Sequence, residues 1–188
     1  AECAGCLGQA FTDAPAVFNG TLAEICTLDL NTDSHNRGIF IASLNAVMKH
    51  LGLVDCTVHC KNDTPELCAA DAVSYIHGNY NNPKIGLIGY QPALFEHLAT
   101  EFELRVVDLN PDHIGKNCFG ITVEDGNSNV IQQDICDWAD LVLCTGSTVC
   151  NGTITRYLPL KDKILFFGTS LAGAAKLMDL PRLCFADK

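Results

Sequence analysis

Residues 83–108 read PKIGLIGYQPALFEHLATEFELRVVD, and this stretch decides the fold of the chain. Its apolar run at residues 85–88 is typical of a buried strand, and a helix is predicted from Pro92 to about Glu101. A second apolar strand is predicted at residues 104–108. A strand, a helix and a second strand in this order form the repeating unit of a parallel sheet.

The same alternation continues towards the C-terminal end of the chain. A short helix is predicted at residues 132–138, and further strands at residues 141–144, 164–167 and 183–185. Continuous apolar strands separated by helices indicate a sheet that is covered on both faces. We therefore predict an α/β fold in which residues 83–188 form a doubly wound, mainly parallel, Rossmann-like domain. A strand order of 2-1-3-4-5 would fit this pattern.

Residues 1–82 are predicted to form a smaller, Cys-rich α+β part that ends at a turn-rich stretch before Pro83. Helical periodicity predicts three helices there, at residues 21–28, 36–51 and 65–76. Ser34 or Asp33 is the expected cap of the second helix, because both side chains can accept hydrogen bonds from its first turn.

The composition suits a globular protein, since 48% of the 188 residues are hydrophobic and only 18% are charged. The formal net charge of −10 argues against nucleic acid or an anionic membrane as a partner, because both attract basic surfaces. The sequence shows neither the long apolar run of a membrane span nor the pattern of a signal peptide. We expect a cytoplasmic protein that binds a metal or a small-molecule ligand, and a homo-oligomer or a partner protein stays open.

Cysteine is abundant, with 11 residues in the chain, and four candidate metal ligands lie close together in sequence. They are Cys56, His59, Cys60 and Cys68. Thiolate and imidazole groups are preferred by soft and borderline metals, so these residues are candidate ligands of a metal ion or an iron–sulfur cluster. Their spacing matches no zinc-finger or ferredoxin pattern, and buried structural thiols are the alternative interpretation.

A second candidate is the motif Cys3-Ala4-Gly5-Cys6, a compact pair of thiols that could bind metal or take part in redox chemistry. A disulfide framework is disfavoured because the cysteine count is odd and the chain resembles an intracellular α/β domain.

Three segments follow predicted strands and put glycine or hydroxyl residues before a helix, where free N–H groups favour an anion. They contain Gly89, Tyr90, Gln91, Thr145, Gly146, Ser147, Thr148, Gly168 and Thr169. Asp108 ends the second strand, where a ribose-binding acid often lies. These residues predict a cleft for a nucleotide-like or other anionic small molecule. Ordinary turns and helix caps are the alternative, and no dinucleotide fingerprint or P-loop is present.

Several segments together resemble the Rossmann-like proteins of anaerobic bacteria and archaea labelled "putative heavy-metal chelation". They lie at residues 8–13, 36–37, 45–47, 57–61, 88–93, 145–148, 151–153 and 173–177. The resemblance implies a Rossmann-like fold and metal chelation, and it adds Asn151 to the candidate ligand contacts. Longer relatives carry an enolase-like N-terminal domain, and Cys3, Cys6, Cys144 and Cys150 stand outside the family pattern.

Two functions follow from these observations. The first is a cytoplasmic metal- or metallocofactor-handling protein, with thiol ligands in residues 1–82 and an anionic-ligand cleft at the strand ends. The second is an enzyme that binds a nucleotide-like molecule in this cleft, with structural cysteines. No nucleophile or general base is placed clearly enough to name a reaction, so enzymatic activity stays open.

Overall fold

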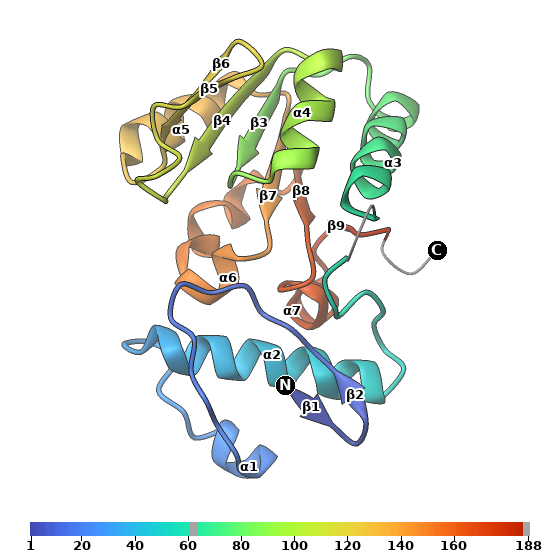
Figure 1. The fold of residues 1–188 in the computed structure, drawn as a ribbon, viewed down its shortest axis with the longest axis vertical. Coiled ribbons are helices and arrows are strands. Elements are labelled where there is room, and N and C mark those ends of the chain that lie inside the picture. Colours follow the sequence, from blue (N-terminus) through green and yellow to red (C-terminus); the bar gives the residue numbers. More distant parts are fainter. Residues whose placement is uncertain (61–63, 186–188) are drawn as a thin grey trace. The chain divides into compact units, whose positions relative to one another are not determined.

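The structure is a computed structural model that describes residues 1–60 and 64–185, and it has the predicted α/β architecture (Figure 1). The main sheet has seven strands in the order β5-β6-β4-β3-β7-β8-β9. Strand β3 pairs in parallel with β4 and β7, β4 pairs in parallel with β6, and β8 with β9. Among the described pairs of this sheet, only the edge pair β5 and β6 is antiparallel. The predicted mainly parallel sheet is therefore confirmed.

The five predicted strands form the continuous middle and one edge of this sheet, in the order 2-1-3-4-5. They are β3 (Ile85–Ile88), β4 (Leu104–Asp108), β7 (Leu141–Thr145), β8 (Ile164–Phe167) and β9 (Arg182–Leu183). All four residues of β3 are buried, as expected for a strand with neighbours on both sides and helices on both faces. Strand β9 begins before the predicted residues 183–185 and shares only Leu183 with them.

Two strands at the other edge of the sheet were missed by the sequence analysis. They are β5 (Asn117–Cys118) and β6 (Ile121–Asp125), joined by Phe119 and Gly120 in positive-φ conformations. Strand β6 has a single fully buried side chain, that of Val123. An edge strand of this kind leaves no continuous apolar run in the sequence, so the strand pattern was not detectable.

The chain divides into two compact units, and unit 2 comprises residues 60–144 and 162–165. Its helices are α3 (Thr64–Asn79), α4 (Pro92–Glu101) and α5 (Asn129–Trp138). Helix α3 packs beside α4, with α4 in front of the sheet and α5 behind it in Figure 1. Phe95, Leu98 and Ile135 are fully buried in this unit, and each contributes about 1.5–3 kcal/mol by leaving water.

Unit 1 comprises residues 1–59 and 145–161 and continues from residue 166. Its helices are α1 (Leu22–Ile25), α2 (Ser34–His50), α6 (Thr148–Asn151) and α7 (Ala172–Met178), with short 3-10 turns η1 (Thr153–Arg156) and η2 (Leu158–Leu160). Helix α2 contacts α1, α6 and α7. Asp33 caps α2 by accepting from the backbone N of His35 at 2.8 Å, which confirms one of the two predicted caps. The predicted domain boundary near residue 83 stays a prediction.

A two-stranded hairpin begins unit 1 and was not predicted as a strand pair. Strands β1 (Glu2–Cys3) and β2 (Cys6–Leu7) are antiparallel, and both contact α2 (Figure 1). The strands are too short to produce a periodic pattern in the sequence.

The longest described helix, α2, has 17 residues. None of the described helices has both the length and the apolar character that crossing a membrane requires.

Candidate functional site

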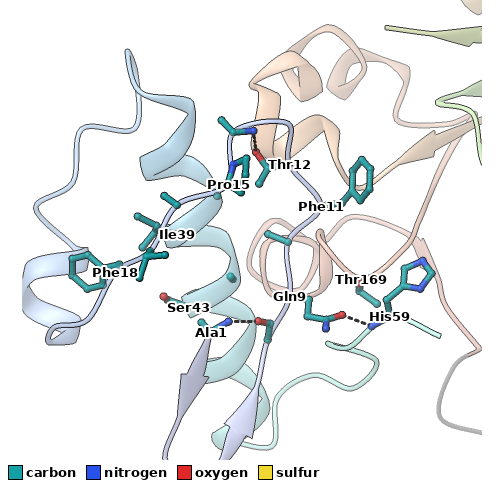
Figure 2. Close-up of a pocket in the computed structure, with 17 residues that line it drawn as sticks. Ala1, Gln9, Phe11, Thr12, Pro15, Phe18, Ile39, Ser43, His59 and Thr169 are labelled. Atoms are coloured by element: carbon teal, nitrogen blue, oxygen red, sulfur yellow. Dashed lines mark hydrogen bonds between the residues drawn. The ribbon is translucent and has the colours of Figure 1, made fainter. Parts of the chain in front are cut away.

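A pocket of about 590 Å³ lies within unit 1, between residues 8–18 and one face of α2 (Figure 2). Apolar side chains form much of its wall, among them Phe11, Phe18 and Ile39. The polar residues that line it are Gln9, Thr12, Ser43, His59 and Thr169. An apolar pocket with a few polar groups is the usual form of a small-molecule site.

Gly8 allows the first wall of the pocket to lie directly against α2. A Cβ atom at this position would stand 2.3 Å from the backbone N of Ala46 and 2.4 Å from the backbone O of Ala42. Both neighbours are helix backbone atoms that cannot move independently. A side chain at position 8 would therefore push residues 8–18 away from the helix and change the pocket.

Asn45, in the middle of α2, holds two residues that line the pocket. Its side chain is fully buried, and its Nδ2 donates to the backbone O atoms of Gln9 at 2.8 Å, Thr169 at 3.2 Å and Ser170 at 3.1 Å. Its Oδ1 accepts from the backbone N of Gly173 at 2.7 Å. A buried amide with satisfied donors and acceptors ties three separate chain segments together.

Hydrogen bonds hold Gln9 in the wall of the pocket. The backbone N of His59 donates to Gln9 Oε1 at 2.7 Å, and the backbone N of Gln9 donates to Thr57 O at 2.9 Å. In Figure 2, Gln9, His59 and Thr169 lie towards one side of the pocket, together with Phe11, whereas Phe18, Ile39 and Ser43 lie towards the other. Each side of the pocket thus combines polar and apolar side chains.

The pocket brings together two residues that the sequence analysis had selected for different reasons. His59 was a candidate metal ligand, and Thr169 was a candidate contact of an anionic ligand; both line the same cavity. Their roles as ligands stay predictions. An imidazole and a hydroxyl group that line the same cavity can bind a metal-containing or an anionic molecule.

The six predicted metal ligands are distributed over both units. Cys3, Cys6, Cys56 and His59 belong to unit 1, and Cys60 and Cys68 belong to unit 2. Among residues 1–60 and 64–185, no three His, Cys, Asp or Glu side chains form a group that could hold a metal ion. A site with three or four protein ligands is therefore not assembled in the described part of the chain.

Cys56 lies in an irregular loop and has an unusual backbone conformation. Its φ of 55° is in the left-handed region, which costs a residue with a Cβ atom about 1–2 kcal/mol. Arg182 holds this loop by donating to the backbone O of Asp55 at 3.0 Å and of Cys56 at 3.4 Å. The Cys56 thiol is buried and lies 3.8 Å from the backbone O of Cys184. The surrounding structure therefore imposes the conformation of Cys56.

Cys144 and Cys150 bracket the loop that follows β7, and both are buried. Burial raises the pKa of the Cys150 thiol to about 12, since a thiolate would lose its hydration there. Arg37 opposes this shift, but the effect of burial is larger. Cys150 is thus a neutral thiol at physiological pH and a poor metal ligand or nucleophile.

A second polar cluster lies in unit 2 around Asp108, at the end of β4. Asp108 Oδ2 accepts from the backbone N of Tyr90 at 2.6 Å, and Oδ1 accepts from the backbone N of Asn110 at 2.8 Å. His113 Nδ1 lies 3.1 Å from Oδ1, and its ring is 4.4 Å from that of Tyr90. Burial raises the pKa of Tyr90 above its ordinary value. The Asp108 carboxylate thus holds two loops, while its predicted contact with a ribose stays a prediction.

Several other predicted ligand contacts make local hydrogen bonds in turns and helix caps. Gln91 caps α4 by accepting from the backbone N of Leu94, and Asn151 Oδ1 accepts from the backbone N of Thr153 at 3.0 Å. Thr145 Oγ1 lies 3.1 Å from Ser147 Oγ, and Thr148 Oγ1 donates to the backbone O of Thr145 at 2.8 Å. These bonds are those expected if the residues only form ordinary turns and helix caps, which was the alternative interpretation. Ligand binding by these residues stays a prediction.

The glycines of the strand-end segments differ in what surrounds them. Gly89 and Gly168 have positive φ values of 98° and 89°, which favour glycine. Gly146 instead packs tightly, since a Cβ atom there would stand 2.9 Å from the backbone N of Leu171. Gly89, Tyr90, Gln91 and Asp108 belong to unit 2, and the remaining predicted contacts belong to unit 1.

Gln9, which lines the pocket, and Asn45, which hydrogen-bonds to two lining residues, were not selected as site residues from the sequence. A signal existed for Asn45, because an amide in the middle of an apolar helix face requires buried partners. Gln9 carried no comparable signal, since its role depends on His59, 50 residues away.

Comparison with known proteins identifies relatives of this architecture. A family model described as "Putative heavy-metal chelation" (DUF364) matches residues 71–177, more than half of the chain. Two solved structures of proteins with unknown function from this family are similar, one from Pyrococcus horikoshii and one from Desulfitobacterium hafniense DCB-2. Both are 18% identical to this chain, with TM-scores of 0.53 and 0.54. A search of curated proteins found no match.

The two structures cover 85% and 80% of this chain, and the chain spans 58% and 56% of their lengths. At this level of identity the likeness shows a shared fold, and the predicted family resemblance is confirmed by the family model.

Proposed function

The chain belongs to the DUF364 family, described as "Putative heavy-metal chelation", and we propose on this premise that it handles a metal ion or a metallocofactor. The family match is the observation that carries the proposal. In this proposal the protein binds the metal either as an ion that it carries or as part of a bound cofactor. A soft or borderline metal, or an iron–sulfur cluster, suits the sulfur and nitrogen donors of the chain.

The proposed ligands are Cys56, His59, Cys60 and Cys68, with Cys3 and Cys6 as a second set. Among the described residues, no three His, Cys, Asp or Glu side chains form a group that could hold a metal ion. A site with three or four protein ligands would therefore have to assemble when the metal binds. Metal binding is often coupled to such ordering, since the binding free energy offsets its cost.

The pocket supports the metallocofactor form of the proposal. His59 lines it and belongs to the proposed ligands, and the cavity is large enough for a small molecule. A metal held with an organic or anionic group could therefore occupy the pocket, with Gln9 and Thr169 facing the polar part of this molecule.

Metal analysis of protein purified without oxygen tests the proposal. We expect a stoichiometric metal, or iron with acid-labile sulfide and a visible absorption band. Cys60→Ser should lose it, because the substitution removes a thiolate donor. Cys26→Ser is the matched control, since Cys26 is an exposed cysteine outside the proposed ligands. Protein without metal or sulfide under these conditions contradicts the proposal, and equal loss in both variants contradicts the ligand assignment.

A second candidate function is an enzyme that binds a nucleotide-like molecule at the strand ends, with structural cysteines. The observation that favours it is the Asp108–His113 pair, since a carboxylate that holds Nδ1 leaves Nε2 oriented for proton transfer. This function predicts that AMP or ATP raises the melting temperature of metal-free protein, and that His113→Ala abolishes the effect. Substitution of Gly146 would test only packing, because an added Cβ atom would stand 2.9 Å from the backbone N of Leu171.

A further inference from the structure

Cys3 and Cys6 lie directly opposite each other in the hairpin of unit 1. The register pairs Glu2 with Leu7 and Cys3 with Cys6, so the two thiols project from the same face of the strand pair. Ala4 and Gly5 join the strands with φ values of 47° and 80°. Two positive φ values in a two-residue loop characterise the type I′ turn, whose twist matches that of the strands.

The hydrogen-bond pattern determines how far apart the two cysteines are. Gly8 N donates to Ala1 O at 2.9 Å, and Ala1 N donates to Gly8 O at 2.7 Å. Hydrogen-bonded and non-hydrogen-bonded pairs alternate along an antiparallel ladder, so Cys3 and Cys6 form a hydrogen-bonded pair two positions further on. Such pairs are the wider ones, with Cα atoms about 5.5 Å apart.

This spacing leaves room for a bridging ion. Opposite residues of an antiparallel pair have Cβ atoms roughly 4.5–5.5 Å apart, and the wide, hydrogen-bonded pairs lie towards the upper end of this range. Disulfides prefer Cβ atoms about 3.5–4.5 Å apart, whereas an ion between two sulfur atoms requires a longer sulfur–sulfur separation than a direct bond does. Both cysteines are free thiols in the structure, so both are available as ligands.

Contacts within unit 1 hold the hairpin in place. Thr57 Oγ1 donates to the backbone O of Leu7 at 2.7 Å, and Gly8 packs against the backbone of α2. Both cysteines are half-buried, so neither is enclosed in the core. The pair is therefore preorganised, and binding requires little additional ordering.

The number of ligands selects the class of ion. No third His, Cys, Asp or Glu joins the pair within the part of the chain that the structure describes. Zinc prefers four ligands in a tetrahedron, and the pair alone does not satisfy it. Soft ions such as Cu(I) and Hg(II) bind thiolates strongly and accept two of them in a linear arrangement.

We propose that Cys3 and Cys6 form a two-thiolate chelate for a soft, two-coordinate metal ion of the Cu(I) or Hg(II) type. This proposal deepens the proposed function and rests on it for the class of cargo. On binding, each thiol releases one proton to solvent and each sulfur donates an electron pair to the ion. No electron is transferred, and no oxidant or reductant is consumed.

Competitive titration of the reduced, metal-free chain with Cu(I) tests the proposal, with bicinchoninate as the competing chelator. We expect the wild type to bind one tight equivalent that the Cys3→Ser/Cys6→Ser double variant lacks. Cys6→Ser alone should weaken this equivalent on the order of 100-fold or more, because the second thiolate binds intramolecularly. Cys26→Ser should leave it unchanged. X-ray absorption should show two sulfur neighbours around the bound copper.

A third variant separates the geometry of the hairpin from its sulfur content. Gly5→Val keeps both thiols but places a β-branched residue at a φ of 80°, where no neighbouring atom blocks the side chain. It should weaken the tight equivalent while leaving the fold of the chain unchanged by circular dichroism.

Unchanged tight binding in the double variant would overturn the chelate, as would a Cys3–Cys6 disulfide in anaerobically purified protein. These results are distinguishable from failure of the proposed function. Purified protein that lacks metal but binds Cu(I) at the hairpin contradicts the function and supports the chelate. Purified protein that carries metal in both the wild type and the double variant, with unchanged Cu(I) binding, supports the function and overturns the chelate.

Discussion

The hairpin thiols and the core thiols of this protein are the same chemical group in opposite environments. Cys3 and Cys6 face each other on a half-exposed strand pair, whereas Cys144 and Cys150 are at most 1% exposed. Burial raises the pKa of Cys150 to about 12, so its thiolate is scarce at neutral pH. The difference teaches that pairing and access, and not the number of cysteines, separate the thiols that we propose as metal ligands from those of the core.

The largest expected effect comes from placing a charge among the core thiols. Cys144→Asp would bury a carboxylate near the end of β7, since Cys144 is 0% exposed. We expect the free energy of unfolding to fall by about 4 kcal/mol or more, measured by urea denaturation. Cys26→Asp at an exposed position should change it by less than about 0.5 kcal/mol. Equal losses in the two variants would show that the environments of these cysteines do not differ as described.

A smaller loss should follow from Gly8→Ala, which acts on the support of the hairpin. The added Cβ would stand 2.3 Å from the backbone N of Ala46, so the hairpin must shift from α2. We expect a loss of about 1–3 kcal/mol in unfolding free energy and weaker Cu(I) binding, although both thiols are retained. Gly78→Ala is the control, because no atom lies within 4 Å of its added Cβ. Unaltered Cu(I) affinity in Gly8→Ala would mean that the chelate does not need this support.

The pH dependence of the unfolding free energy tests the effect of burial on the Cys150 thiol. Below pH 9 Cys150 keeps its proton in both the folded and the unfolded chain. Between pH 9 and about 12 the unfolded chain loses this proton while the folded chain retains it. Stability should therefore fall by up to about 1.4 kcal/mol per pH unit in this window through Cys150. The contribution of Cys150 is measured as the difference in unfolding free energy between the wild type and Cys150→Ala, determined by urea denaturation at several pH values. Parallel curves of unfolding free energy against pH for the two proteins would contradict it.

The smallest effect is expected at the turn of the hairpin. Ala4 has a φ of 47°, and Asn adopts this conformation more readily than Ala. Ala4→Asn should raise the unfolding free energy by up to about 1 kcal/mol and leave Cu(I) binding equal or tighter. Thermal denaturation measures the change in stability, and the bicinchoninate competition measures the Cu(I) affinity. Ser128→Asn, at an existing helix cap in unit 2, is a control that should leave Cu(I) binding unchanged. A clear loss of Cu(I) affinity in Ala4→Asn would show that the turn is not of the type described.

Much of the sheet was predictable because its signals are local. The apolar residues of β3, β4, β7 and β8 form uninterrupted runs, and Asp33 precedes α2 at a capping position. Strands β5 and β6 were missed because edge strands with one buried side chain have no such run. The loops at the strand ends were located for a similar reason, since loops after parallel strands have recognisable glycine and hydroxyl residues. Ligand binding by these loops stays a prediction.

The candidate site was less predictable because its parts meet through contacts that are distant in sequence. His59 and Thr169 were selected separately, and their common pocket depends on Gln9 and on the hydrogen bonds of Asn45. Periodicity along the chain carries no information about such pairs. The role of Cys3 and Cys6 as opposite residues was likewise hidden, because the motif alone did not reveal a two-residue type I′ turn.

The sequence by itself determined the five strands of the parallel part of the sheet, the α/β class and the family, since apolar runs and caps act over a few residues. Only the tertiary structure decided which polar groups share a cavity, which thiols are buried and which two face each other. The physical reason is that burial and hydrogen bonding depend on the approach of segments far apart in the chain. Asn45 illustrates this, because three of its four hydrogen bonds reach residues 124 to 128 positions away.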